Sequence, residues 1–151
     1  MTQGTSLNEL ADLVMTHMAE VATLHGLSGP RVQMENMYFS VRYFAAGEGG
    51  PALGLELLVE FNPFFVYPVL FRVGPDGEPS PGFNTDKRRV WMYLQEAFEE
   101  YPRRRIPWSE EWKRLGRDYR NCARMVDVVA GVLRTAWPEL RRRTPELFPG
   151  D

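Results

Sequence analysis

The chain has 151 residues, of which 44% are hydrophobic and 25% charged, and its formal net charge is −2. This composition is typical of one globular domain with its own core. Two His residues and one Cys stand against nine Phe, six Tyr and four Trp. Because proton transfer most often uses His, and structural zinc sites need clustered Cys and His, the composition disfavours a metal centre or a histidine-dependent enzyme.

The sequence also bears on location. A single Cys excludes an intramolecular disulfide and fits a reducing compartment. Residues 1–8 lack the pattern of a signal peptide, and the longest apolar stretch, residues 61–71, contains prolines and is too short to span a bilayer. We therefore expect a cytoplasmic protein that makes no membrane contact. Residues 1–100 sum to −7 and residues 101–151 to +5; this asymmetry could steer a charged partner, although solvated helix faces are the simpler explanation.

The first predicted element is a helix over residues 7–25. Ser6 and Glu9 form a capping box, and Gly26 stands where a glycine would close the helix. Apolar residues follow one another at spacings of three and four, which indicates a single buried stripe: Leu7, Leu10, Val14, Met18, Val21 and Leu24.

Strands are predicted next. An extended segment begins near Val32, and residues 38–44, 55–61 and 66–73 are typical of strands, the last with Pro68 at an edge or a kink. In the second of these strands, apolar residues alternate with Glu56, Leu58 and Glu60. We expect Leu55, Leu57, Val59 and Phe61 to face the helices. Glu56 and Glu60 should face solvent, because burying unpaired carboxylates costs several kcal/mol.

Two more helices are predicted after residue 84. One runs from about Thr85 to Tyr101, and a last helix begins at Ser109 and is limited by Pro138. Its regular apolar stripe is Trp112, Leu115, Tyr119, Cys122, Val126, Val129 and Leu133. The fold class is therefore α+β: an N-terminal helix, a three- or four-stranded antiparallel meander and two C-terminal helices packed on one sheet face. Residues 1–143 form one domain, and residues 144–151 a loosely ordered tail.

A catalytic or metal constellation is not evident, and we expect no cofactor. His17 and His25 are eight residues apart with no further ligand nearby, and Cys122 lies on the core stripe as a small hydrophobe. Glu56 and Glu60 could do acid–base work or bind a cation, although two acids on a solvent face are more simply solvated. The arginines Arg117, Arg120 and Arg124 stand at helical spacing. An overall pI near 5.8 disfavours nucleic-acid binding by them.

The densest aromatic cluster is Phe61, Phe64, Phe65, Tyr67 and Phe71. Strand alternation cannot point all of these rings to one side, so part of the cluster lies at a sheet edge or on the outer face, where exposed apolar groups mark partner sites. Burial under residues 103–108 is the equally weighted alternative. The candidate partner-binding residues are Glu48, Glu56, Glu60, Phe64 and Tyr67.

The C-terminal third carries a family resemblance. Asp118-Tyr119-Arg120, then an apolar helix, then Ala136-Trp137-Pro138-Glu139-Leu140 and three arginines resemble the sixty-third immunity family of bacterial polymorphic toxin systems, over residues 112–143. That family has an Asp-x-Arg pair opening a long helix and a Trp beside a Pro, but there Pro precedes Trp. Asp118 and Arg120 are two apart and would not face each other on a helix, so we expect each to pair with another element. Both, with Trp137, are interpreted as structural.

The resemblance implies a protein that neutralises a cognate toxin by direct binding in the cytoplasm, without catalysis or cofactor. We therefore expect a non-catalytic binding protein, monomeric or weakly homodimeric. Two alternatives stay open: a dimeric secretion chaperone with an apolar groove, and a small enzyme that uses carboxylates such as Glu56 and Glu60.

Overall fold

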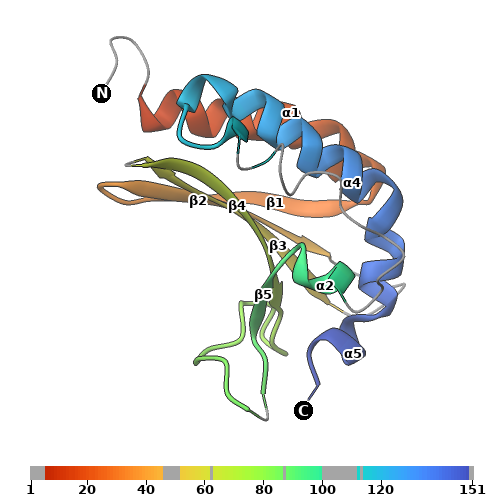
Figure 1. Ribbon diagram of the computed structural model, residues 1–151. Helices are drawn as coiled ribbons and strands as arrows, with labels where there is room; N and C mark the ends of the chain where they lie inside the picture. Colours follow the sequence, from red (N-terminus) through yellow and green to blue (C-terminus); the bar gives the residue numbers. More distant parts are fainter. Residues whose placement is uncertain are drawn as a thin grey trace.

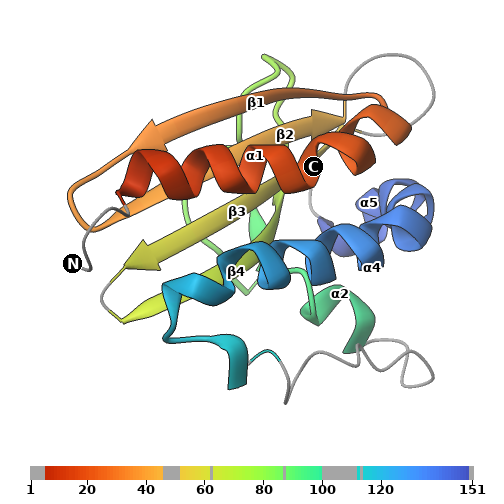
Figure 2. The ribbon, with the colours of Figure 1, turned by 90° about the horizontal axis from the view of Figure 1, so that it is seen from above.

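The computed structural model describes residues 6–45, 52–61, 63–86, 88–99, 112 and 114–149. One five-stranded antiparallel sheet has the strand order β1-β2-β3-β4-β5, and helices α1 and α4 lie side by side on one of its faces (Figures 1 and 2). The elements are α1 (Leu7–Leu24), β1 (Leu27–Met34), β2 (Tyr38–Ala45), β3 (Leu53–Phe61), β4 (Phe64–Arg72), β5 (Trp91–Tyr93), α2 (Glu96–Glu99), η1 (Tyr119–Asn121), α4 (Cys122–Arg142) and α5 (Thr144–Leu147). The α+β meander is confirmed, with five strands.

Helix α1 follows its sequence signals. The Ser6 hydroxyl accepts a hydrogen bond from the Glu9 backbone N–H at 3.2 Å, and Gly26 adopts a left-handed φ of 63° after the last turn. Its buried side chains are Leu10, Ala11, Val14, Met18 and Val21; of the other stripe residues, Leu7 is half-buried and Leu24 is exposed. The capping box and the glycine therefore fix both ends of this helix.

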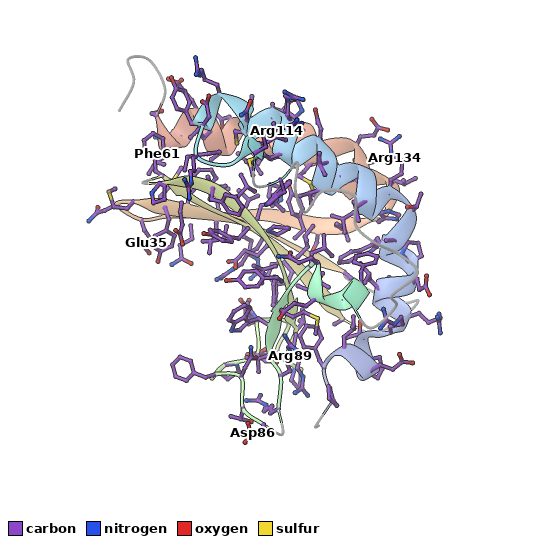
Figure 3. The ribbon with its side chains drawn as sticks, viewed as in Figure 1. Glu35, Phe61, Asp86, Arg89, Arg114 and Arg134 are labelled. Atoms are coloured by element: carbon purple, nitrogen blue, oxygen red, sulfur yellow. The ribbon has the colours of Figure 1, made fainter. Side chains whose placement is uncertain are left out.

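Strand β3 shows the predicted alternation. Leu55, Leu57 and Val59 are fully buried on the face that packs against the helices. Phe61 is half-buried on the same face and stacks on Tyr119 of η1 at a centroid distance of 6.3 Å. Figure 3 shows Phe61 on the helix side of the sheet. Glu56 points to the opposite face as expected, but it is only partly exposed.

The helix predicted from Thr85 is wrong over residues 85–95. Val90 precedes strand β5, which pairs with Val69, Leu70 and Phe71 of β4, and helix α2 (Glu96–Glu99) is the helical part among the described residues of this segment. The backbone N–H of Val90 donates to the Asn84 side-chain oxygen at 2.8 Å, and the Val90 carbonyl accepts from Arg72. Because these partners lie outside any helical turn, the apolar spacing that indicates a helix is overridden by pairing with β4.

Pro68 lies in a part of β4 that is not paired with β5, as expected for a residue that has no backbone N–H. Its carbonyl accepts a hydrogen bond from the Leu94 backbone N–H, directly after β5 ends. The N and C=O of one strand residue point to the same side. The absent N–H of Pro68 therefore lies where β4 has no further strand residue to pair with.

The predicted C-terminal helix is interrupted, and it does not end at Pro138. Trp112, Arg114 and Leu115 are helical, but Arg117 then takes a left-handed φ of 74° and donates its backbone N–H to the Phe64 carbonyl at 2.7 Å, and helix α4 begins at Cys122. Ser109 lies outside the described residues. Pro138 does not end the helix, which continues to Arg142, and Figure 1 shows that α4 is not straight. Burial of Trp137 and Leu140 anchors the last turns and offsets the hydrogen bond that proline removes.

The predicted stripe and tail can be compared directly with burial. Every stripe residue is buried except Tyr119, which is half-buried. The tail is not loosely held over residues 144–148: Thr144 and Leu147 of α5 and the following Phe148 are buried against the domain. The apolar side chains of Leu147 and Phe148 hold the chain end against the domain, whereas the two prolines of the tail had indicated a loosely ordered end.

Candidate functional site

The outer face of the sheet is the side opposite α1 and α4, and no helix in the described part of the chain covers it (Figure 1). Strand register assigns side chains to it in rows that run across the sheet. Its residues are Arg31, Gln33, Tyr38, Ser40, Arg42, Phe44, Glu56, Leu58, Glu60, Phe65, Tyr67, Val69, Phe71, Trp91 and Tyr93. We call this set the outer face below.

Aromatic rings on β4 and β5 form a continuous series. The centroids of Phe65 and Tyr67 are 4.8 Å apart, those of Tyr67 and Tyr93 5.9 Å, and those of Tyr93 and Trp91 5.2 Å. Trp112 meets the edge of Phe65 at 6.2 Å. Such offset and edge contacts restrict each ring, so the surface is held in shape before any partner arrives.

Two ion pairs lie beside these rings. Arg42 donates from Nε to Glu56 at 2.8 Å, and Arg31 donates from one nitrogen to both Glu78 oxygens at 2.8 Å. The Arg31 guanidinium also lies 4.3 Å from the centroid of the Phe44 ring. The Glu56 side chain is only 15% exposed, so this carboxylate is neutralised by Arg42 and is not the free solvated acid expected from the sequence. A free Glu56–Glu60 carboxylate pair for acid–base chemistry is therefore not present.

Glu60 differs from Glu56. It is exposed, and register places Tyr38 of β2 on one side of it and Phe65 of β4 on the other. No described cationic side chain forms an ion pair with it. Burial raises the pKa of Tyr67, and the negative charge of Glu60 and the neighbouring Tyr93 raise it further. Glu60 is thus an uncompensated negative charge beside the aromatic series.

The candidate residues from the sequence are placed differently. Glu60 and the half-buried Tyr67 lie together on the outer face, as expected. Phe64 is buried at 3% exposure on the helix side and is a wrong candidate, because it pairs with Phe61 and shares that residue's face. Glu48 lies outside the described residues, as do residues 103–108, which were the alternative cover for the aromatic cluster.

Six outer-face aromatics were not among the sequence candidates: Tyr38, Phe44, Phe65, Phe71, Trp91 and Tyr93. Phe65 immediately follows Phe64, and starting the strand at residue 64 would have assigned it to the outer face by alternation. Trp91 and Tyr93 were not considered as surface candidates because their segment was predicted to be helical, although a Trp-x-Tyr pattern is itself typical of a strand.

Asp118 and Arg120 bind each other, so the prediction that each pairs with another element is wrong. Arg120 donates to Asp118 from Nε at 3.0 Å and from Nη2 at 2.8 Å. The pairing is possible because Asp118 is in an extended conformation and caps η1, whereas the prediction assumed that both residues lie on a helix. The hydrogen bond from Arg120 lowers the pKa of Asp118. Trp137 is a core residue at 2% exposure, as interpreted from the sequence.

The histidines and the cysteine serve the packing of the helices. His17 contacts Asp127 at 2.7 Å and His25 contacts the Leu133 carbonyl at 2.9 Å, so both hold α1 against α4. Burial raises the pKa of Cys122 to about 12. Within the described ranges, no group of three or more His, Cys, Asp or Glu side chains is arranged to hold a metal ion. No helix in these ranges is long and apolar enough to cross a membrane.

The arginines of the last helical region form a separate surface. Arg117 and Arg124 are exposed, and Arg120 extends from the surface while bound to Asp118. Arg120 belongs to η1 and Arg124 to α4 in the helix layer, and Arg117 lies in the turn just before η1; we call these three residues the arginine face. No family model, curated protein or solved structure matches the chain. The interpretation of both surfaces therefore depends on their physical chemistry.

Proposed function

We propose that this chain is a non-catalytic protein-binding domain that uses its outer face to bind and neutralise a cognate bacterial toxin. The observation that carries the proposal is the series of contacting aromatic rings on a sheet face that no described helix covers. The toxin as partner, and the cytoplasm of the producing cell as the place of binding, come from the resemblance over residues 112–143.

The composition of this face fits a protein partner. Tyr, Trp and Arg are the residues that most often carry binding energy at protein interfaces, and all three occur here. The four long strands span three strand spacings, which by the length of β3 give a projected area of about 430 Å². Ser40, Phe44, Val69 and Phe71 on this face are already buried. The area open to a partner is therefore below the roughly 800 Å² that each partner buries in an interface of standard size.

The charge of this face fits a basic partner surface. Glu60 and the nearby Glu35 are exposed, and Figure 3 shows Glu35 on the side of the sheet away from the helices. Many toxin active sites act on nucleic acids or nucleotides and are basic, so an acidic and aromatic inhibitor surface would give fast, salt-sensitive association. The opposite arrangement, in which the arginine face binds an acidic partner, is the second candidate.

Cell protection tests the proposal. The toxin encoded by the neighbouring gene should arrest growth, and co-expression of this chain should restore it. The double variant Tyr67→Ala/Trp91→Ala should lose protection, while Arg124→Ala on the arginine face should keep it. Thermal midpoints of the purified variants control for folding. Loss of protection by Arg124→Ala alone would favour the arginine face, and failure of the native chain to protect would remove the toxin proposal.

A further inference from the structure

Glu60 differs from three other carboxylates around the outer face, because no described cation forms an ion pair with it. Glu56 binds Arg42, Glu78 binds Arg31 and Glu96 binds Arg89, each within 2.9 Å. Glu60 keeps an exposed negative charge at the end of the sheet near the β1–β2 turn.

The two cross-strand neighbours of Glu60 are aromatic. Tyr38 is 41% exposed and Phe65 is half-buried, and both share the face of Glu60 by register. They are two strand spacings apart, or about 9.6 Å at Cα. A flat group held between two rings needs about 3.5–4.0 Å on each side, or about 7–8 Å in all. The spacing is therefore wide enough for one planar cation above the Glu60 carboxylate.

The Phe65 ring is held in place by the residues that pack against it. Trp112 meets its edge, and a side chain at Gly116 would collide with the Phe65 ring, so this glycine allows the loop after Leu115 to pack directly on the ring. Tyr67 contacts the same ring at 4.8 Å. A ring fixed by three neighbours loses little further freedom when a ligand docks against it.

We infer that Tyr38, Glu60 and Phe65 form a seat for the guanidinium group of an arginine side chain on the partner protein. This inference rests on the proposed function and names the chemistry of the partner at one point of the outer face. Arginine fits better than lysine, because its planar guanidinium can stack on aromatic rings and donate two parallel hydrogen bonds to one carboxylate. The Glu60 charge, which no described group of this chain neutralises, would then be neutralised in the complex.

The seat is tested by measuring how tightly the purified toxin encoded by the neighbouring gene binds to matched variants of this protein. Glu60→Gln keeps the shape and removes the charge, and we expect at least a tenfold loss of affinity. Glu9→Gln makes the same change of net charge at an exposed acid of α1, in the helix layer, and should change affinity less than twofold. Tyr38→Leu should weaken binding as Glu60→Gln does. Equal losses for Glu60→Gln and Glu9→Gln would overturn the seat, because they would show only long-range attraction.

A second measurement needs no toxin and separates failure of the seat from failure of the proposed function. Methylguanidinium chloride is titrated into the isolated protein while ring resonances of Tyr38 and Phe65 are followed by NMR, with sodium chloride at equal concentration as control. Saturable shifts at these rings that disappear in Glu60→Gln support the seat, even if the neighbouring toxin does not bind. Shifts that match the sodium chloride control, or that persist in Glu60→Gln, would overturn it.

Discussion

The Tyr43 hydroxyl offers the clearest test of how the core is packed. This side chain lies on the helix side of β2 opposite Leu55, is 1% exposed, and its hydroxyl has no hydrogen-bond partner among the described residues. An unpaired buried hydroxyl costs about 1–3 kcal/mol, whereas the phenyl ring keeps the same packing. We therefore expect Tyr43→Phe to stabilise the protein by about 1 kcal/mol at pH 7.

The pH dependence of the free energy of unfolding gives a second quantitative test of Tyr43→Phe. Burial raises the pKa of Tyr43 from 10.0 to about 12. The unfolded chain therefore releases this proton above about pH 10 while the folded protein keeps it, so stability is fully present below pH 10 and falls as pH rises towards 12. At about 1.36 kcal/mol per pH unit, the loss reaches about 2.7 kcal/mol. Tyr43→Phe removes this loss, so its advantage should grow from about 1 to about 4 kcal/mol.

Urea unfolding at pH 7, 10, 11 and 12 measures both effects. The exposed Tyr38 supplies the matched control for loss of a hydroxyl, since Tyr38→Phe should leave the free energy of unfolding at pH 7 unchanged. Other alkaline titrations, including that of Cys122, occur in all variants and cancel in the difference. A parallel pH slope for Tyr43→Phe and the native protein, or a destabilised Tyr43→Phe at pH 7, would refute the reasoning.

Three further predictions concern the last helical region. Because burial raises the Cys122 pKa to about 12, a thiol reagent at pH 8 should label this residue only after denaturant is added, and labelling of the native protein would show that the site opens. Leu115→Ala should lower the free energy of unfolding by about 2–5 kcal/mol, and an unchanged urea midpoint would mean that this contact is absent. Left-handed backbone costs a non-glycine residue about 1–2 kcal/mol, so Arg117→Gly should raise the thermal midpoint while Arg124→Gly, inside α4, lowers it. The reverse order would show that Arg117 is not strained.

Elements with a local signal were predictable from the sequence. The capping box and spacing of α1, and the alternation of β3, each follow from residues within one element. Strand β5 was not predictable in this way, because its three residues are extended only through pairing with β4 and through the Asn84 side chain. The spacing of Val90, Leu94 and Phe98 satisfies a helix equally well until these distant partners are known.

The candidate site depended on register, where one residue decides the face. Glu60 and Tyr67 were placed on the correct face, but choosing Phe64 in place of Phe65 selected a core residue instead of one on the outer face. The ion pair of Glu56 could not be predicted either, because its partner Arg42 lies on another strand and becomes a neighbour only when the sheet forms. Patterns along the chain thus predict the faces of the sheet, whereas pairings across it decide which charges remain free.

Hydroxyl-radical footprinting of the complex with the neighbouring toxin tests the central claim most directly. Tyr38 and Trp91 are 41% and 39% exposed on the outer face, and Leu24, 59% exposed at the end of α1, reports on the helix layer. We predict that toxin binding strongly reduces the oxidation of Tyr38 and Trp91 and leaves that of Leu24 unchanged. Oxidation of Tyr38 and Trp91 at the level of the free protein, in a complex shown to be saturated, would contradict binding through the outer face.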